Sequence, residues 1–321
     1  IPGVRLDAQG ICQFCRQAEA RKEKEAELRR SFRDKFMELI ASQAGQGEYD
    51  CVLAFSGGKD SSYTLYLLQE VYKLRVLALT FDNWFQSEQA WFNVRQVGSY
   101  FNVQQEILRP GYTDFCAIVR ACMQPDLFPL KTMQRASAIC TVCLAMIRAA
   151  AFKLAIEKEI PFVVFGLSPG QAPVSTAVFK SNAQMMRKMQ DSILKAMPEE
   201  VRKILAKYFL QKRHFEKQEN FPYSINPLAF EDYSEQDMLD LLHAYGWAEP
   251  EDTDANSTNC LLNSLANEVH VQNQGFNPYI FELSALIRSG CLKRDEAMAR
   301  IKAPVDGELI SKVQEQLNRE V

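Results

Sequence analysis

Nine cysteines stand out in this chain of 321 residues, and four of them form two C-x-x-C pairs. The first pair is Cys12 and Cys15, and the second is Cys140 and Cys143. This spacing brings two sulfur atoms close enough to bind one metal or to form a redox couple. Because no segment reads as a signal peptide, we expect a reducing, cytoplasmic compartment. There, such pairs are more often metal or redox sites than structural disulfides.

The strongest chemical signal is the string S-G-G-K-D-S at residues 56–61, which is followed by Ser62. A glycine pair lets backbone N–H groups turn toward an anion, and a helix that starts here adds the partial positive charge of its N-terminus. The serines supply hydroxyl donors, and Lys59 supplies a mobile positive charge. The string matches neither G-x-x-x-x-G-K-[ST] nor G-x-G-x-x-G. A tight strand–helix turn is the alternative, but the expected flanking elements favour a phosphate-binding loop, here called the glycine loop (residues 56–62).

The glycine loop resembles the PP-loop of the ATP pyrophosphatases, also called adenine nucleotide alpha-hydrolase-like proteins. The resemblance implies that ATP binds with Mg²⁺, a substrate oxygen is adenylated, pyrophosphate leaves, and a sulfur or nitrogen nucleophile displaces AMP. Lys59 would stabilise the departing pyrophosphate, and Asp60 would bridge to Mg²⁺ or order the loop. For Asp82, capping of a helix is an equal alternative to binding. The expected nucleotide-binding residues are Ala54, Phe55, Ser56, Gly57, Gly58, Lys59, Asp60, Ser61, Ser62, Thr80, Asp82 and Gly166.

The second C-x-x-C pair and a distant cysteine extend this resemblance. The order of the glycine loop, then Cys140 and Cys143, then Cys260 is similar to that of iron–sulfur-dependent thiolases. It implies a [4Fe–4S] cluster held by these three thiolates, with a fourth iron open to carry sulfide, and a catalytic role for Cys260. We therefore expect sulfur to be either added to the activated substrate or removed from it through the cluster. Cys116, Cys122 and Cys291 are competing candidates for the third ligand. A redox pair, half a zinc site and buried thiols remain alternatives for the pair itself.

One segment departs from those thiolases. They carry a Gly-His-x-x-Asp-type motif after a later core strand, whereas residues 166–171 here read G-L-S-P-G-Q. The acceptor therefore stays open between a tRNA and a small molecule, and a sulfur donor is expected as a partner.

The N-terminal motif supports a different function. Asp7, Gly10, Ile11, Cys12 and Cys15 form a D-x-x-G-I-C-x-x-C string that resembles the opening of the N-acetyl sugar amidotransferases. The resemblance implies half of a four-cysteine zinc knuckle, with the other half expected upstream of the first residue. The alternative function is ATP-dependent amidation of an acetamido sugar, with ammonia from a partner subunit. A third possibility, from another class, is a non-catalytic nucleotide-binding sensor.

The order of predicted elements explains how these residues could meet. Apolar runs at residues 50–55, 75–81 and 161–166 predict buried parallel strands, with an edge strand at 104–108. A strand–helix–strand order indicates a right-handed crossover. The carboxyl ends of such strands are where ligands bind. We predict helices at residues 16–43, 63–73, 87–101, 136–158, 181–215, 234–245, 277–289 and 293–301.

Composition agrees with a folded enzyme. Hydrophobic residues make up 47% and charged residues 24%, and the formal net charge of −3 excludes a polycation built for nucleic acid. We see no apolar run near the roughly 20 residues needed to span a bilayer, so we expect no membrane contact; a homodimer is possible.

The predicted fold is α/β, a doubly wound parallel sheet with helical N- and C-terminal additions. We divide it into a cysteine loop and charged helix (1–46), the ATP pyrophosphatase core (47–180), and a mainly helical region partly returning to the core (181–321).

Overall fold

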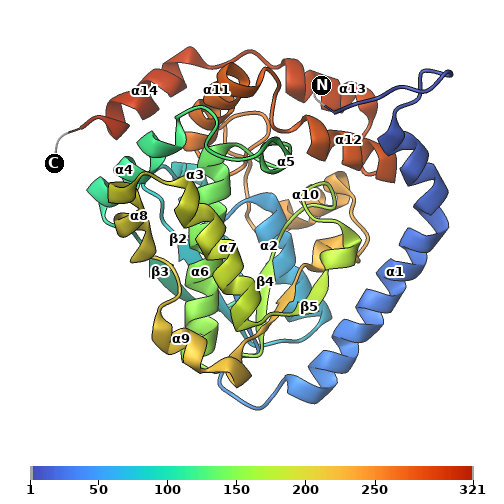
Figure 1. The fold of residues 1–321 in the computed structure, drawn as a ribbon. Helices are drawn as coiled ribbons and strands as arrows, with labels where there is room; N and C mark the ends of the chain where they lie inside the picture. The colour runs from blue at the N-terminus through green and yellow to red at the C-terminus, as the bar shows by residue number, and fades with distance from the viewer. Residues whose placement is uncertain (1–2, 320–321) are drawn as a thin grey trace.

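The computed structural model describes residues 3–319 of the chain and contains one six-stranded sheet (Figure 1). The strand order across the sheet is β3-β2-β1-β4-β6-β5. Every neighbouring pair is parallel except β5 and β6, which are antiparallel. The strands are β1 (Cys51–Ala54), β2 (Val76–Phe81), β3 (Gln104–Leu108), β4 (Phe162–Phe165), β5 (Val178–Lys180) and β6 (Tyr223–Ile225).

The position of β1 fixes where a ligand can bind. From β1 the chain runs outward through β2 to β3, and it later returns to the other side of β1 as β4. In an open parallel sheet, the crevice at such a change of direction lies outside the carboxyl ends of the strands. Here that crevice lies beyond Ala54 and Phe165, which pair in the register of β1 and β4. The predicted doubly wound α/β fold is therefore confirmed.

Alternating side chains of the strands enter two separate cores. Val52 and Leu77 pack with the cluster built around α4 (Tyr112–Cys122) and α6 (Ala138–Glu157). Leu53 and Ala78 pack with the opposite cluster, which includes Phe36 of α1 (Gln13–Gln43). Because both faces of the sheet are covered, its strands read as continuous apolar runs rather than as alternating ones.

The remaining helices complete these two layers. Figure 1 shows α1 along one side of the molecule and the C-terminal helices α11–α14, in orange and red, along its upper edge. The other elements are α2 (Lys59–Tyr66), the π-helical turn η1 (Leu67–Val71), α3 (Glu88–Tyr100), α5 (Leu130–Met133), η2 (Val174–Thr176), α7 (Ala183–Ala196), α8 (Glu199–Ala206), α9 (Lys212–Glu216), η3 (Gln218–Asn220), η4 (Pro227–Ala229), α10 (Glu235–Ala244), α11 (Leu262–Gln274), α12 (Ile280–Ser289), α13 (Arg294–Lys302) and α14 (Gly307–Leu317).

The long helix predicted over residues 181–215 is wrong. Pro198 interrupts it, and the preceding Met197 is extended with ψ of 146°. Proline has no N–H to donate and disfavours a helical residue before it, so α7 ends here and α8 begins. A second break, at residues 207–211, separates α8 from α9.

The sequence analysis predicted a helix at residues 136–158 but overlooked how apolar it is. By length and composition, α6 could cross a membrane: it has 20 residues with a mean hydropathy of 1.9 over its best window. Half of that window is buried inside the protein. Its side chains, among them Met146 and Phe152, belong to one of the two cores. Its apolar character therefore matches that of a central core helix, which passes the same test.

Candidate functional site

The glycine loop joins the end of β1 to α2 and is held in a conformation that only glycine adopts easily. Gly57 has φ of +74°, and a Cβ atom there would lie 2.3 Å from the carbonyl oxygen of Ala90. The indole Nε1 of Trp247 donates a hydrogen bond of 2.8 Å to the carbonyl of Gly57. A residue outside the loop thus holds the Gly57 carbonyl by a hydrogen bond, and this fixes the orientation of the peptide between Gly57 and Gly58.

The serines of the loop organise it from within. The backbone N–H of Ser56 donates to Ser61 Oγ at 3.2 Å, and that hydroxyl donates to the carbonyl of Gly58 at 3.0 Å. The Ser62 hydroxyl is fully buried and has no hydrogen-bond partner in the described part of the chain. The loop therefore keeps its shape through its own side chains, and Ser62 retains an unused donor.

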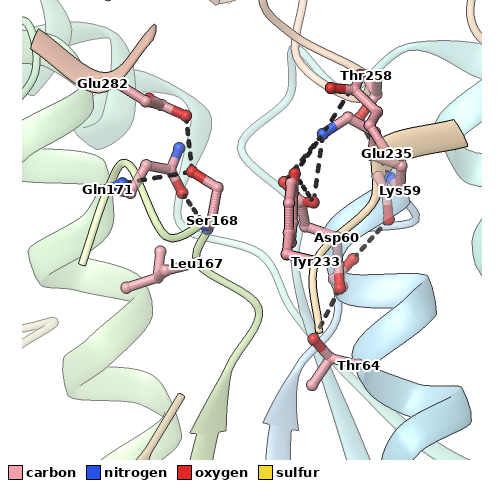
Figure 2. Close-up of polar contacts among 12 residues, drawn as sticks. Lys59, Asp60, Thr64, Leu167, Ser168, Gln171, Tyr233, Glu235, Thr258 and Glu282 are labelled. Carbon is pink, nitrogen blue, oxygen red and sulfur yellow. Dashed lines mark hydrogen bonds and ion pairs between the residues drawn. The ribbon is translucent and has the colours of Figure 1, made fainter. Parts of the chain in front are cut away.

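Lys59 lies in a compact network with two acids and a tyrosine, shown on the right of Figure 2. Its Nζ is 3.2 Å from Asp60 Oδ1, 3.3 Å from the Tyr233 hydroxyl and 3.8 Å from Glu235 Oε1. The Tyr233 hydroxyl donates to Asp60 Oδ1 at 3.0 Å. Burial of Lys59 lowers its pKa, but the charges of Asp60 and Glu235 outweigh burial and raise it. Lys59 is therefore cationic at neutral pH, and the two carboxylates face it.

The other predicted nucleotide-binding residues lie at the carboxyl ends of β1, β2 and β4. The Thr80 hydroxyl is buried and donates to the carbonyl of Phe55 at 2.8 Å. Asp82 accepts from the N–H of Trp84 at 2.9 Å and forms an ion pair with Arg109. Thr80 thus links the ends of β1 and β2, while Asp82 shapes the turn after β2. Two further predicted residues flank the loop: Ala54 ends β1, and a Cβ atom on Gly166 would lie 2.8 Å from the carbonyl oxygen of Asp60.

A distant segment connects the glycine loop to the third predicted cysteine. Thr258 Oγ1 accepts from the N–H of Lys59 at 3.2 Å, so it binds the first turn of α2 from outside. The segment continues along the end of β2, where Ser87 N–H donates to the carbonyl of Asn259 at 3.0 Å. Cys260 follows directly and forms an isolated bridge with Gln86. Only one residue therefore separates the side chain that contacts the loop from the Cys260 thiol.

The second C-x-x-C pair lies at the start of α6. Ser137 caps this helix by accepting from the N–H of Cys140 at 3.1 Å. Cys143 follows one turn later on the same face. Burial raises the pKa of Cys143 well above its usual value, and the charges of Cys140 and Cys260 raise it further. The three cysteines, here called the thiol triad (Cys140, Cys143, Cys260), are therefore close enough to influence one another.

The environment of the thiol triad suits soft metal ligation. Burial raises the pKa of Cys140 to about 11 and also raises that of Cys260, although the Asn83 amide donates to the Cys260 sulfur at 3.2 Å. Buried thiols without a cation stay protonated, whereas a bound metal deprotonates them. No three His, Cys, Asp or Glu side chains within residues 3–319 are grouped tightly enough to hold a single ion. Cysteine thiolates are the usual ligands of iron–sulfur clusters, and the thiol triad offers three of them.

Cys122 also contributes to this region, although the sequence ranked it only as a competitor. Its charge raises the pKa of Cys143, and the charge of Cys140 raises that of Cys122 after the larger effect of burial. It ends α4 and is buried in the core.

The N-terminal pair forms a separate unit at the start of α1. The sulfur atoms of Cys12 and Cys15 are 3.4 Å apart, and Asp7 orders the preceding turn by accepting from the N–H of Ile11 at 2.9 Å. The ring of Phe14 lies 5.9 Å from that of Phe281 on α12. Two sulfur atoms are thus presented together, and this unit packs on the helix that contributes Glu282 to the site.

Several site residues escaped the sequence analysis because they lie far along the chain from the glycine loop. On the left of Figure 2, Glu282 of α12 accepts a hydrogen bond of 2.9 Å from the Ser168 hydroxyl, which follows β4. Burial raises the pKa of Glu282 to about 7; Asp60 adds to the shift, while Ser168 and Lys59 oppose it. No local sequence pattern marks these residues as parts of a site. The sequence indicated only that their segments follow core strands or begin helices. The missed residues are Ser168, Gln171, Tyr233, Glu235, Thr258, Tyr279 and Glu282.

Comparison with known proteins adds distant likenesses. No family model matches the chain. It is 24% identical over 258 residues to an uncharacterised protein of Methanocaldococcus jannaschii, covering 80% of this chain and 74% of that protein.

Three solved structures resemble the fold. The first is a U34-tRNA thiolase from Methanococcus maripaludis with its [4Fe–4S] cluster, at 15% identity and a TM-score of 0.37, covering 91% of this chain and 81% of that one. The second is an NMN synthetase from Francisella tularensis, at 12% identity and a TM-score of 0.40, covering 91% of this chain and 97% of that one. The third is an ammonia-dependent NAD synthetase from Campylobacter jejuni, at 13% identity and a TM-score of 0.38, covering 91% of this chain and 93% of that one. At these levels the fold assignment depends on the sheet itself, and the functional argument depends on the site.

Proposed function

We propose that this protein is an ATP pyrophosphatase of the PP-loop type that adenylates a substrate and then replaces the activated oxygen with sulfur. The observation that carries the proposal is the segment from Thr258 to Cys260. It contacts the backbone of Lys59 at one end and places a member of the thiol triad at the other. This contact supports a single site in which the glycine loop would bind pyrophosphate and the thiol triad would supply sulfur ligands.

The chemistry of the first step follows from the glycine loop. Phosphate oxygens of ATP would accept from the loop N–H groups and the hydroxyls of Ser56 and Ser62. Lys59 would leave its carboxylate partners to neutralise the departing pyrophosphate. Asp60 and Glu235 would then be free to bind Mg²⁺, a hard cation that prefers oxygen ligands. A substrate oxygen attacks the α-phosphorus, the bond to the β-phosphate oxygen breaks, and pyrophosphate leaves with the electron pair.

The chemistry of sulfur delivery follows from the thiol triad. Cys140, Cys143 and Cys260 would hold a [4Fe–4S] cluster as thiolates. With three protein ligands, one iron of such a cluster keeps a position for an exogenous sulfide. Asn83, through its hydrogen bond to the Cys260 sulfur, would orient that ligand and stabilise its negative charge.

A second candidate is favoured by the N-terminal unit. Asp7 and the two cysteines form an ordered turn, as the D-x-x-G-I-C-x-x-C resemblance implies. In that case the nucleophile is ammonia and the substrate is an acetamido sugar, with the same use of ATP. The two candidates differ in the nucleophile and not in the first step.

The test is the fate of ATP labelled at the α-phosphate. Anaerobic protein is incubated with two probe mixtures: unfractionated tRNA with sodium sulfide, and UDP-N-acetylglucosamine with ammonium chloride. We expect AMP and pyrophosphate, and no ADP, from one of the mixtures. Lys59→Ala should abolish this release, whereas Lys212→Ala, at a side chain that is 90% exposed, should retain it. Cleavage to ADP and phosphate, or full activity of Lys59→Ala, would refute the proposal.

A further inference from the structure

Glu282 occupies a position opposite the glycine loop that the proposed mechanism has not used. It lies in the first turn of α12, and Figure 2 shows its side chain together with Ser168 and Gln171 on the left, with the Lys59 network on the right. A Cβ atom on Gly170 would lie 2.6 Å from the carbonyl oxygen of Glu282. The loop after β4 thus packs directly on the start of α12, and this close contact fixes where the Glu282 carboxylate lies.

The charge of this carboxylate acts on groups in both halves of the site. It raises the pKa of Lys59 and of Tyr233, after the larger effects of burial and nearer groups. It also raises the pKa of Tyr279, together with the charges of Cys140 and Asp254. The titratable groups that face Glu282 are Lys59, Asp60, Tyr233 and Tyr279.

Glu282 carries no counter-ion within residues 3–319, unlike three other carboxylates near the glycine loop. Asp60 pairs with Lys59, Asp82 with Arg109, and Glu235 with both Lys59 and Arg300. Among the residues that the structure describes, Glu282 has no basic side chain at ion-pair distance, and its hydrogen-bond partners, the Ser168 hydroxyl and the Gln171 side chain, are neutral. A carboxylate in this state can take up a proton without breaking an ion pair.

We propose that Glu282 is the catalytic base of the second step, in which the nucleophile displaces AMP. This inference rests on the proposed function. The nucleophile forms a bond to the activated carbon, the bond from that carbon to the AMP oxygen breaks, and AMP leaves with the electron pair. The proton of the nucleophile passes to a Glu282 carboxylate oxygen and then to solvent. The same role serves hydrosulfide and ammonia, because both lose one proton in this step.

The proton affinity of Glu282 agrees with that role. Burial raises its pKa to about 7, so both protonation states are populated near neutral pH. A base of this kind can accept a proton during the reaction and return it afterwards. Ser168 donates to the carboxylate and is a positioning residue.

The decisive comparison is Glu282→Gln, which keeps the size and removes the base. In single turnovers with the active probe mixture, we expect pyrophosphate release within twofold of the wild-type rate. AMP release should fall by about 10²-fold or more, and the adenylated substrate should accumulate. Glu282→Asp should recover part of the AMP release. Equal losses in both steps, or no loss in either, would overturn the inference. Absence of pyrophosphate release by the wild-type protein is instead a failure of the proposed function.

A second measurement, the titration of the Glu282 carboxyl group, tests the inference without any acceptor substrate. The carboxyl titration is read by ¹³C NMR of glutamate-labelled protein, with Glu282→Gln assigning the signal. We expect a midpoint near neutral pH that rises in Lys59→Ala, since a cation is lost, and falls in Asp60→Asn, since an anion is lost. A midpoint below about pH 5.5 would overturn the inference even if no probe mixture were turned over, because Glu282 would then be an ordinary surface-like carboxylate.

Discussion

Replacing Glu282 with glutamine should stabilise the fold in a pH-dependent way. The folded pKa of Glu282 is about 7, against 4.5 for an unperturbed glutamate, and burial is the main cause. Between these values the folded state holds a proton that the unfolded state has lost, so wild-type stability falls as pH rises toward 7. At about 1.36 kcal/mol per pKa unit, the difference between these two pKa values limits the loss of folding free energy to about 3 kcal/mol.

Urea denaturation from pH 4.5 to 8.5 measures this effect in metal-free, reduced protein. The free energy of unfolding of Glu282→Gln should exceed the wild-type value by an amount that grows by up to about 3 kcal/mol across this range and levels off above pH 7. Glu308→Gln, at a side chain that is 79% exposed, is the matched control and should show no such growth. A flat difference for Glu282→Gln would refute the burial and placement of this carboxylate on which the proposed base depends.

Two further predictions concern the loop and the cysteines. Gly57→Ala should lower the melting temperature by several degrees in scanning fluorimetry, because φ is positive and its Cβ would meet the Ala90 carbonyl; Gly307→Ala, with open space around its Cβ, should not. Iodoacetamide at pH 8 should modify Cys12 first in metal-free protein, since the N–H of Cys15 lowers the Cys12 pKa. Cys140, with a pKa raised to about 11, should react only as the pH rises toward that value, and equal rates in peptide mass spectrometry would contradict this.

The sequence was sufficient for β1 to β4 and for the glycine loop because these signals are local, whereas β5 and β6, with three residues each, were not predicted. The apolar run before Ser56 and the glycines after it fix a strand and a turn within a few residues. Residues 104–108 form the edge strand as predicted. The break at Pro198 was also a local signal, but the helical composition on both sides of it outweighed it in the prediction.

The acidic half of the site could not be predicted in this way. Tyr233, Thr258 and Glu282 reach the glycine loop across more than 170 residues of chain, and nothing in their own neighbourhoods marks them. Their meeting depends on how α12 and the segment before α11 pack over the carboxyl ends of the strands. The Gly-His-x-x-Asp comparison drew attention to a segment that has no acid of its own, and Ser168 of this segment donates a hydrogen bond to Glu282 from a distant helix.

The most direct test of the central claim is the iron and sulfide content of anaerobically purified protein, measured together with its absorption spectrum. The proposed function predicts about four irons per chain and broad absorption near 400 nm. Iron should be lost in Cys260→Ser and retained in Cys291→Ser, with Cys12→Ser as a control for metal at the N-terminal pair. A colourless, iron-free wild-type protein, or full iron retention in Cys260→Ser, would contradict the assignment of the thiol triad as a cluster site.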